Sequence, residues 1–266
     1  QAPEYSQDRV DLPFAYPGNA DGLLEQNDTY WSVRGLQALG GQAQAQGVLE
    51  DWLSLGERYS ALPGTNQLND LGRSGMPRIS SLLAEASKNN PDPQFRARAY
   101  SVVEGDHRNN WCDTYFKHTP NGLNRFCDVD YSHEATLVES GGDKNDSRFE
   151  GDASRFNPVD LNAYLYQTEK DLQELAPADK REGWAQAAQE RKALMLDSMW
   201  DAKKGFFFDV DWRTGERSEK PCLAAYSLLE VGLIDQKPMV EALVKALPSF
   251  TGPSGLPGWE PGAQQP

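Results

Sequence analysis

The chain has 266 residues, of which 38% are hydrophobic, and a net charge of −14 at pH 7. This acidic balance repels phosphate backbones and disfavours nucleic-acid binding. No apolar run approaches the roughly 20 residues that a membrane span needs, and the N-terminus shows no signal-peptide pattern. The 7 Trp, 10 Tyr and 10 Phe supply apolar area for a core, which argues against disorder throughout.

The cysteines and histidines lack the spacing of a metal site, so we expect neither a metal nor another cofactor. The histidines are His107, His118 and His133. The three cysteines (Cys112, Cys127 and Cys222) form no Cys-x-x-Cys pair, and their odd number allows at most one internal disulfide. Cys112–Cys127 is the pair to test, but three free thiols are favoured.

Hydrophobic periodicity predicts a series of helices after an irregular, Pro- and Gly-containing start. The predicted helices span about residues 28–39, 44–59, 77–87, 93–104, 160–175, 179–200, 221–231 and 238–247. Residues 203–212 contain Gly-Phe-Phe-Phe-Asp-Val-Asp-Trp and form the one convincing extended or hairpin segment. Since strands do not alternate with the helices, an antiparallel helical array, toroid or solenoid is favoured over a βαβ sheet.

Residues 106–157 differ from the rest, because they are rich in Asp, Asn, Gly, Ser and aromatics and show little periodicity. So long a polar connection inside a compact domain is usually functional. Its densest part, residues 139–149, combines carboxylates, an arginine and an aromatic. Carboxylates in such a loop can act as general acid or base on a sugar. A solvated acidic loop and a calcium site of oxygen ligands are the alternatives.

The same loop resembles a known family. Residues 139–143, 147–149 and 157–163 resemble, in order and spacing, the trehalase pattern S-G-W-D, S-R-W and P-V-D-L-N. Four further stretches resemble trehalase segments in the same order. They are Pro17–Trp31, Pro63–Pro77, Asn124–Asp128 and Met199–Asp211. The resemblance covers the chain from about Leu12 to Leu256.

The resemblance implies an all-α protein with an (α/α)6 toroid that hydrolyses α,α-trehalose with inversion. Asp143 matches the general acid of the family. The substrate-binding positions implied are Asp28, Asn66, Arg73, Glu134 and Arg148. Of these, Arg148 is expected to position the loop that carries Asp143 through a charge-assisted hydrogen bond. This loop, residues 139–149, is called the acid loop below. Read from the residues alone, Asp28, Asp160 and Asn162 could instead be helix N-caps, and Arg73 a structural ion pair.

The domain organisation expected is an irregular lead-in over 1–26, a partial toroid over 27–256 and a Pro/Gly-rich tail over 257–266. The resemblance also implies a periplasmic or secreted location and a small sugar as the partner. The family's general base would lie beyond Pro266, so the toroid is expected to be incomplete in this chain. A second chain that carries the remainder is a possible partner.

The chain also departs from the family pattern. Family arginines fall on Ala20 and Gln67, and family tryptophans fall on Asn27 and Gly142. These losses remove hydrogen-bond donors and stacking surface. A trehalase-like sugar-binding or scaffold protein without activity, and a glycosidase that acts on another small α-glucoside, therefore remain alternatives. A lyase or epimerase on a helical toroid is a third, with His133 as its one nearby candidate.

Overall fold

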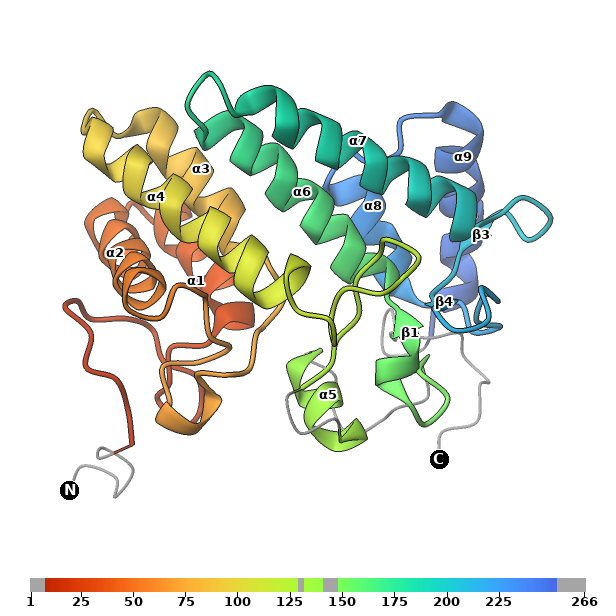
Figure 1. Cartoon of the computed structure of the whole chain (residues 1–266), viewed down its shortest axis with the longest axis horizontal. Coiled ribbons are helices and arrows are strands. Elements are labelled where there is room, and N and C mark those ends of the chain that lie inside the picture. Colours follow the sequence, from red (N-terminus) through yellow and green to blue (C-terminus); the bar gives the residue numbers. More distant parts are fainter. Residues whose placement is uncertain (1–7, 129–131, 141–147, 253–266) are drawn as a thin grey trace. The chain divides into compact units, whose positions relative to one another are not determined.

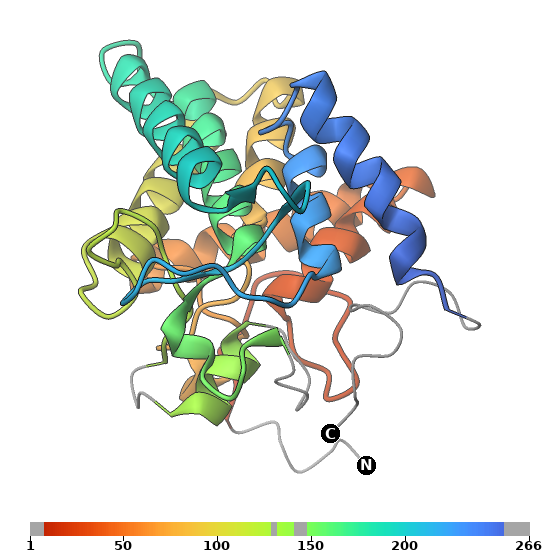
Figure 2. The same cartoon turned by 90° about the vertical axis from the view of Figure 1, so that its right-hand side faces the viewer.

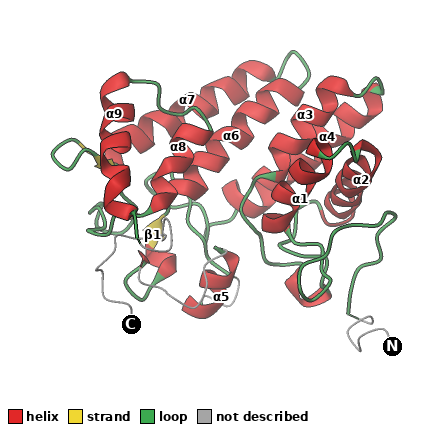
Figure 3. Ribbon diagram, turned by 180° about the vertical axis from the view of Figure 1, so that it is seen from behind, coloured by secondary structure: helices red, strands yellow, loops and turns green. Residues whose placement is uncertain are grey.

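The computed structural model describes residues 8–128, 132–140 and 148–252. Its elements are mostly helices, with a few strands of two residues each (Figures 1 and 3). The chain divides into two compact units, which are described separately. The first unit comprises residues 1–114, 139–141 and 168–185, and the second comprises 115–138, 142–167 and 186–266.

The first unit is built on helices near the N-terminus. They are α1 (Gln26–Ala38), α2 (Gln42–Tyr59), α3 (Ile79–Asn89) and α4 (Pro93–Asp106), and α4 continues as a π-helical turn over His107–Cys112. The α2 and α4 backbones approach closely at Gly56, where an added Cβ would lie 2.2 Å from a methyl carbon of Val102. Trp52 of α2 is fully buried and donates its indole N–H to the Thr29 hydroxyl of α1 at 3.1 Å. Buried aliphatic side chains of all four helices complete this core.

The long helices α6 (Val159–Leu175) and α7 (Arg181–Ser198) follow one another as an antiparallel hairpin, whose turn belongs to the first unit (Figure 1). Near this turn, Leu172 and Leu175 of α6 enter the core of the first unit. Ala163 of α6 and Met195 of α7 enter the core of the second unit. Each helix therefore contributes side chains to both cores.

The second unit contains the short strands and the C-terminal helices (Figure 2). Its elements are α5 (His133–Glu139, up to Val138), β1 (Phe156–Asn157), β2 (Trp200–Asp201), β3 (Phe206–Phe207), β4 (Val210–Asp211), α8 (Ser227–Glu230) and α9 (Lys237–Ala246). Both strand pairs are antiparallel: Phe156 pairs with Asp211 in β1–β4, and Trp200 with Phe207 in β2–β3. The Phe206 ring stacks on Phe250 at 5.8 Å in the core.

The predicted helices and the extended segment all appear, with shifted ends. The helix expected over 221–231 is in fact a 3-10 turn, Leu223–Tyr226, followed by the short α8. Helix α5 and the π turn lie in the segment that was expected to be irregular. Within the described residues, Cys112, Cys127 and Cys222 are not joined in disulfides. Among the helices of the described residues, none combines the length and the apolar composition that crossing a membrane requires.

Candidate active site

The predicted general acid, Asp143, falls within 141–147, outside the described residues, so its neighbourhood is built from the segments on either side. Leu137 of α5 precedes this stretch and Phe149 follows it. Both are buried in one hydrophobic cluster of the second unit, together with Phe156. Residues on both sides of the stretch 141–147 therefore pack in one cluster.

Glu139 ends α5 and is counted with the first unit. Its carboxylate is 1% exposed and its Oε1 accepts two hydrogen bonds from Ser74, from the backbone N–H at 3.1 Å and from the hydroxyl at 2.6 Å. Hydrogen bonds to a charged acceptor are short and strong, and a carboxylate that loses them while buried is costly. Glu139 thus fixes the start of the acid loop.

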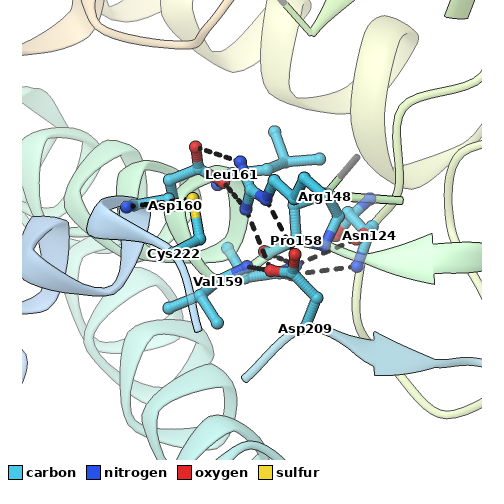
Figure 4. A network of polar contacts seen from close by, with 10 residues as sticks. Asn124, Arg148, Pro158, Val159, Asp160, Leu161, Asp209 and Cys222 are labelled. Carbon is cyan, nitrogen blue, oxygen red and sulfur yellow. Dashed lines mark hydrogen bonds and ion pairs between the residues drawn. The ribbon is translucent and has the colours of Figure 1, made fainter. Parts of the chain in front are cut away.

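Arg148 fixes the end of the acid loop, in the second unit (Figure 4). Its guanidinium donates two hydrogen bonds to Asp160, at 2.7 and 3.0 Å, and two to Asp209, at 2.7 and 2.9 Å. Asp209 also accepts the backbone N–H of Val159 at 2.8 Å and so caps the start of α6. One cation therefore joins the acid loop, the first turn of α6 and the segment between β3 and β4.

The charges of this cluster stabilise one another. Burial lowers the pKa of the Arg148 guanidinium, but the charges of Asp160 and Asp209 outweigh it and raise that pKa well above its ordinary value. Burial raises the pKa of the Asp160 carboxyl, but the Arg148 charge and hydrogen bonds outweigh this and lower it. Both groups therefore stay ionised at neutral pH.

The predicted sugar-binding residues of the first unit lie in different settings. Asp28 is the exposed third residue of α1 and not its N-cap, which is Glu25. Asn66 is buried: its side-chain oxygen accepts the Leu24 N–H at 2.9 Å and its amide donates to Val10 and Tyr16. These contacts use the Asn66 side chain to hold the N-terminal segments in place.

Arg73 and Glu134 complete the predicted set. Arg73 pairs with Asp70 at 2.9 Å, and its backbone carbonyl accepts the Gly64 N–H. The ion-pair alternative for Arg73 therefore agrees with the structure, with its guanidinium still partly exposed. Glu134 is exposed in the first turn of α5, in the second unit.

Sequence reasoning did not single out two residues that the structure places at the ends of the acid loop. Asp209 lies in the segment that resembles the trehalase pattern downstream of Gly205, and it follows three buried phenylalanines. A carboxylate that follows such an apolar run is expected to be buried and to need a hydrogen-bonding or charged partner. This pattern could have identified Asp209 from the sequence. Ser74 gave no comparable signal, because its Glu139 partner lies 65 residues further along the chain.

A cavity of about 460 Å³ in the second unit is a separate feature. It is lined by charged side chains, including the Arg155–Asp211 ion pair, together with Glu150 and Glu219. None of the predicted sugar-binding residues lines it. We therefore do not identify it with the site at the acid loop.

Comparison with known proteins decides the family. The model of the mannosylglycerate hydrolase MGH1-like glycoside hydrolase domain matches residues 69–265, which is well over half of the chain. The chain belongs to this glycoside hydrolase family. Its recognition as a trehalase-type hydrolase is confirmed at this level, because curated trehalases also match. The cytosolic neutral trehalase of Beauveria bassiana is 22% identical over 319 residues, which cover 92% of this chain and 43% of that protein.

Solved structures show the fold of this glycoside hydrolase domain. Neutral trehalase Nth1 from Saccharomyces cerevisiae matches with a TM-score of 0.84 at 21% identity, over 95% of this chain and 58% of that one. A mannosylglycerate hydrolase from Thermus thermophilus, in complex with glucose, matches with a TM-score of 0.65 at 16% identity, over 96% and 77%. The prediction of an all-α fold of the helical-toroid class is confirmed.

The comparisons also correct one expectation for this family member. The periplasmic or secreted location is wrong, because the fungal relative is named a cytosolic neutral trehalase. The chain spans about two fifths of the length of that relative.

Proposed function

We propose that this glycoside hydrolase domain carries the general acid of an inverting α,α-trehalase-like enzyme, with Asp143 in that role. The observation that carries the proposal is the attachment of the acid loop at both ends. Glu139, four residues before Asp143, is held by Ser74, and Arg148, five residues after it, is held by Asp160 and Asp209. A proton donor must be kept close to its working position, and rigid supports around it achieve this.

The chemistry of inversion defines what Asp143 must do. One carboxyl group protonates the leaving glycosidic oxygen while a second, about 6.5–9.5 Å away, activates a water on the opposite face of the sugar. We assign the first task to Asp143. The second carboxyl is proposed to come from outside this chain's residues, from a further segment of the protein or from a second chain.

The substrate proposed is α,α-trehalose, on the support of the curated relatives that are named trehalases. Asp28, Arg73 and Glu134 are proposed to bind sugar hydroxyls, since each is at least partly exposed. Asn66 is proposed to act through the loop that holds Arg73, because its own side chain is bonded to the protein. Arg148 is proposed to position Asp143 and not to contact sugar, since two carboxylates occupy its guanidinium.

A glycoside of mannose and glycerate is the second candidate substrate. The matching family model is described by mannosylglycerate hydrolase, and a solved mannosylglycerate hydrolase shares the fold. Hydrolysis of this compound would use the same general acid. The two candidates differ in the group that leaves, so a direct comparison of substrates separates them.

The test measures hydrolysis of trehalose and of mannosylglycerate by the full-length protein, with NMR detection of the first anomers released. Inversion of trehalose yields one α- and one β-glucose, whereas retention yields α-glucose alone. Asp143→Asn should lower kcat by about 10²–10⁴-fold with sugar binding retained, and Asp146→Asn in the same loop should leave it nearly unchanged. Equal turnover of Asp143→Asn and the wild type would refute the acid assignment. Sugar binding without any turnover by the wild type would favour the binding-protein alternative.

A further inference from the structure

A cysteine, a histidine and a glutamate meet in the first unit. The imidazole Nδ1 of His107 lies 3.4 Å from the Cys112 Sγ, and its Nε2 lies 3.7 Å from the same sulfur. The Nε2 is also 3.3 Å from the Oε1 of Glu169 on α6. The three side chains thus form a chain of contacts from thiol to imidazole to carboxylate.

The π-helical turn over His107–Cys112 produces the first of these contacts. In an α-helix, residues five apart lie about 140° apart around the axis and cannot face each other. A π turn bonds residue i to residue i+5, is rare in proteins, and frequently occurs at functional sites. The unusual backbone therefore places the sulfur against the imidazole ring.

The surroundings hold the imidazole while leaving the thiol accessible. His107 is only 5% exposed, and the Trp184 ring of α7 packs edge-on against it at 5.1 Å. Glu169 is buried as well, whereas Cys112 is partly exposed. Burial lowers the pKa of the His107 imidazole, but its hydrogen bonds with Cys112 and Glu169 outweigh this and raise that pKa to about 9. The imidazole can therefore hold a proton at neutral pH.

We propose that Cys112 is a reactive thiol, activated by His107 and Glu169, which is oxidised by peroxides and alkylated by other small electrophiles. The arrangement is that of activated nucleophiles in general, where a base takes the proton and an acidic group orients the base. The thiol proton moves to His107, and the imidazolium stays paired with Glu169. His107 and Glu169 are positioning residues here, and the sulfur is the atom that reacts.

The oxidation step is balanced by hydrogen peroxide alone. The sulfur attacks one peroxide oxygen, an S–O bond forms and the O–O bond breaks. Hydroxide leaves and takes the proton from His107, so that the products are a sulfenic acid and water. The sulfur loses two electrons and the peroxide gains them. A thiol reductant can reverse this first stage of oxidation.

The other two cysteines serve as internal controls in the same molecule. Cys127 is fully buried. Burial raises the pKa of the Cys222 thiol, although the Arg148 charge acts in the opposite direction. Among the described residues, the hydrogen bond of the Cys222 sulfur is with the Ala224 N–H and not with an imidazole. Any difference in reactivity between Cys112 and these two can be read from one digest of wild-type protein.

The experiment follows iodoacetamide labelling of each cysteine by peptide mass spectrometry between pH 5.5 and 9. An ordinary thiol with a pKa of about 8.5 is only about 1% thiolate at pH 6.5. We expect Cys112 to react at least about tenfold faster than Cys222 at pH 6.5, and to be the cysteine that dimedone traps after peroxide treatment. Equal rates for Cys112 and Cys222 at pH 6.5 would overturn the proposal.

Two variants test the positioning residues against a matched control. His107→Gln should slow Cys112 labelling at pH 6.5 by about tenfold, and Glu169→Gln should move its pH profile to higher pH. His118→Gln removes an exposed imidazole of the second unit and should change neither the labelling rate of Cys112 nor its pH profile. A merely structural role for His107 would leave the pH profile of Cys112 in place. If His107→Gln does not fold, Glu169→Gln and the wild-type comparison still decide the question.

Discussion

Replacing Arg148 by methionine removes the cation that Asp160 and Asp209 share, while a side chain of similar length remains. The exposed fractions of the Arg148, Asp160 and Asp209 side chains are 19%, 13% and 4%, so water can solvate the two remaining carboxylates only in part. Breaking a buried ion pair costs about 3–5 kcal/mol. With the partial exposure taken into account, we expect the free energy of unfolding to fall by about 3 kcal/mol.

Thermal unfolding followed by circular dichroism measures this loss. A change of about 3 kcal/mol corresponds to a Tm lower by roughly 6–12 °C for a chain of this size. The Asp160 pKa is lowered in the folded protein, so its contribution is present above the unfolded pKa of about 3.9 and is lost as the pH falls through the folded value. The difference in unfolding free energy between Arg148→Met and the wild type should therefore be largest near pH 7 and should shrink below about pH 4.

Arg213→Met is the matched control, because Arg213 faces Asp152 at 3.8 Å with side chains 51% and 39% exposed. Such a surface pair contributes about 0–1 kcal/mol. If Arg148→Met were no less stable than Arg213→Met, the Arg148 cluster would not hold the end of the acid loop, and the support for the Asp143 assignment would be withdrawn.

Three further predictions concern other parts of the chain. Glu139→Gln weakens the two hydrogen bonds that Ser74 donates, so it should lower kcat for sugar hydrolysis by a larger factor than it changes KM. An unchanged kcat would contradict the role of the Ser74–Glu139 contact. Phe206→Ala should cost about 3–5 kcal/mol of unfolding free energy in denaturant titration, against about 0.5 kcal/mol or less for Leu39→Ala at an exposed position. Burial raises the pKa of the Asp51 carboxyl from 3.8 to about 6, so the folded state binds this proton more tightly and stability falls as pH rises from about 4 to 6. Asp51→Asn should therefore flatten the fall in the free energy of unfolding between about pH 4 and 6, and identical pH profiles of the variant and the wild type would contradict this prediction.

The helices could be predicted from the sequence because each buries one face. Val48, Trp52 and Leu55 fall on one side of α2 at helical spacing, and all three are buried in the core. The helix ends were predicted less accurately than the helices themselves. Helix α1, for example, begins at Gln26 without a side-chain cap, so the sequence gives no local signal for its start. The π turn over His107–Cys112 could not be predicted, because its widened backbone depends on contacts with α6 and α7 that only the fold supplies.

Of the candidate site, the sequence indicated the loop and one of its supports. From the family resemblance, Arg148 was expected to position the loop through a charge-assisted hydrogen bond. Its actual partners are Asp160, twelve residues away, and Asp209, 61 residues away, and the second lies beyond the range of local patterns. Asn66 matched a sugar-binding position, but only the structure shows that Leu24, Val10 and Tyr16 use its side chain.

The contacts of Glu139 with Ser74 and of Arg148 with Asp209 depend on the folding of distant parts of the chain. Ser74 lies 65 residues before Glu139, and Asp209 lies 61 residues after Arg148, so neither contact can form before distant parts of the chain have come together. Proteins open locally before they unfold globally, and a segment whose ends are not held by the rest of the fold opens early. Leu137 and Phe149 hold those ends by packing, while the two polar anchors fix their direction. Loss of one anchor should therefore reduce activity under conditions in which the helical cores are still intact.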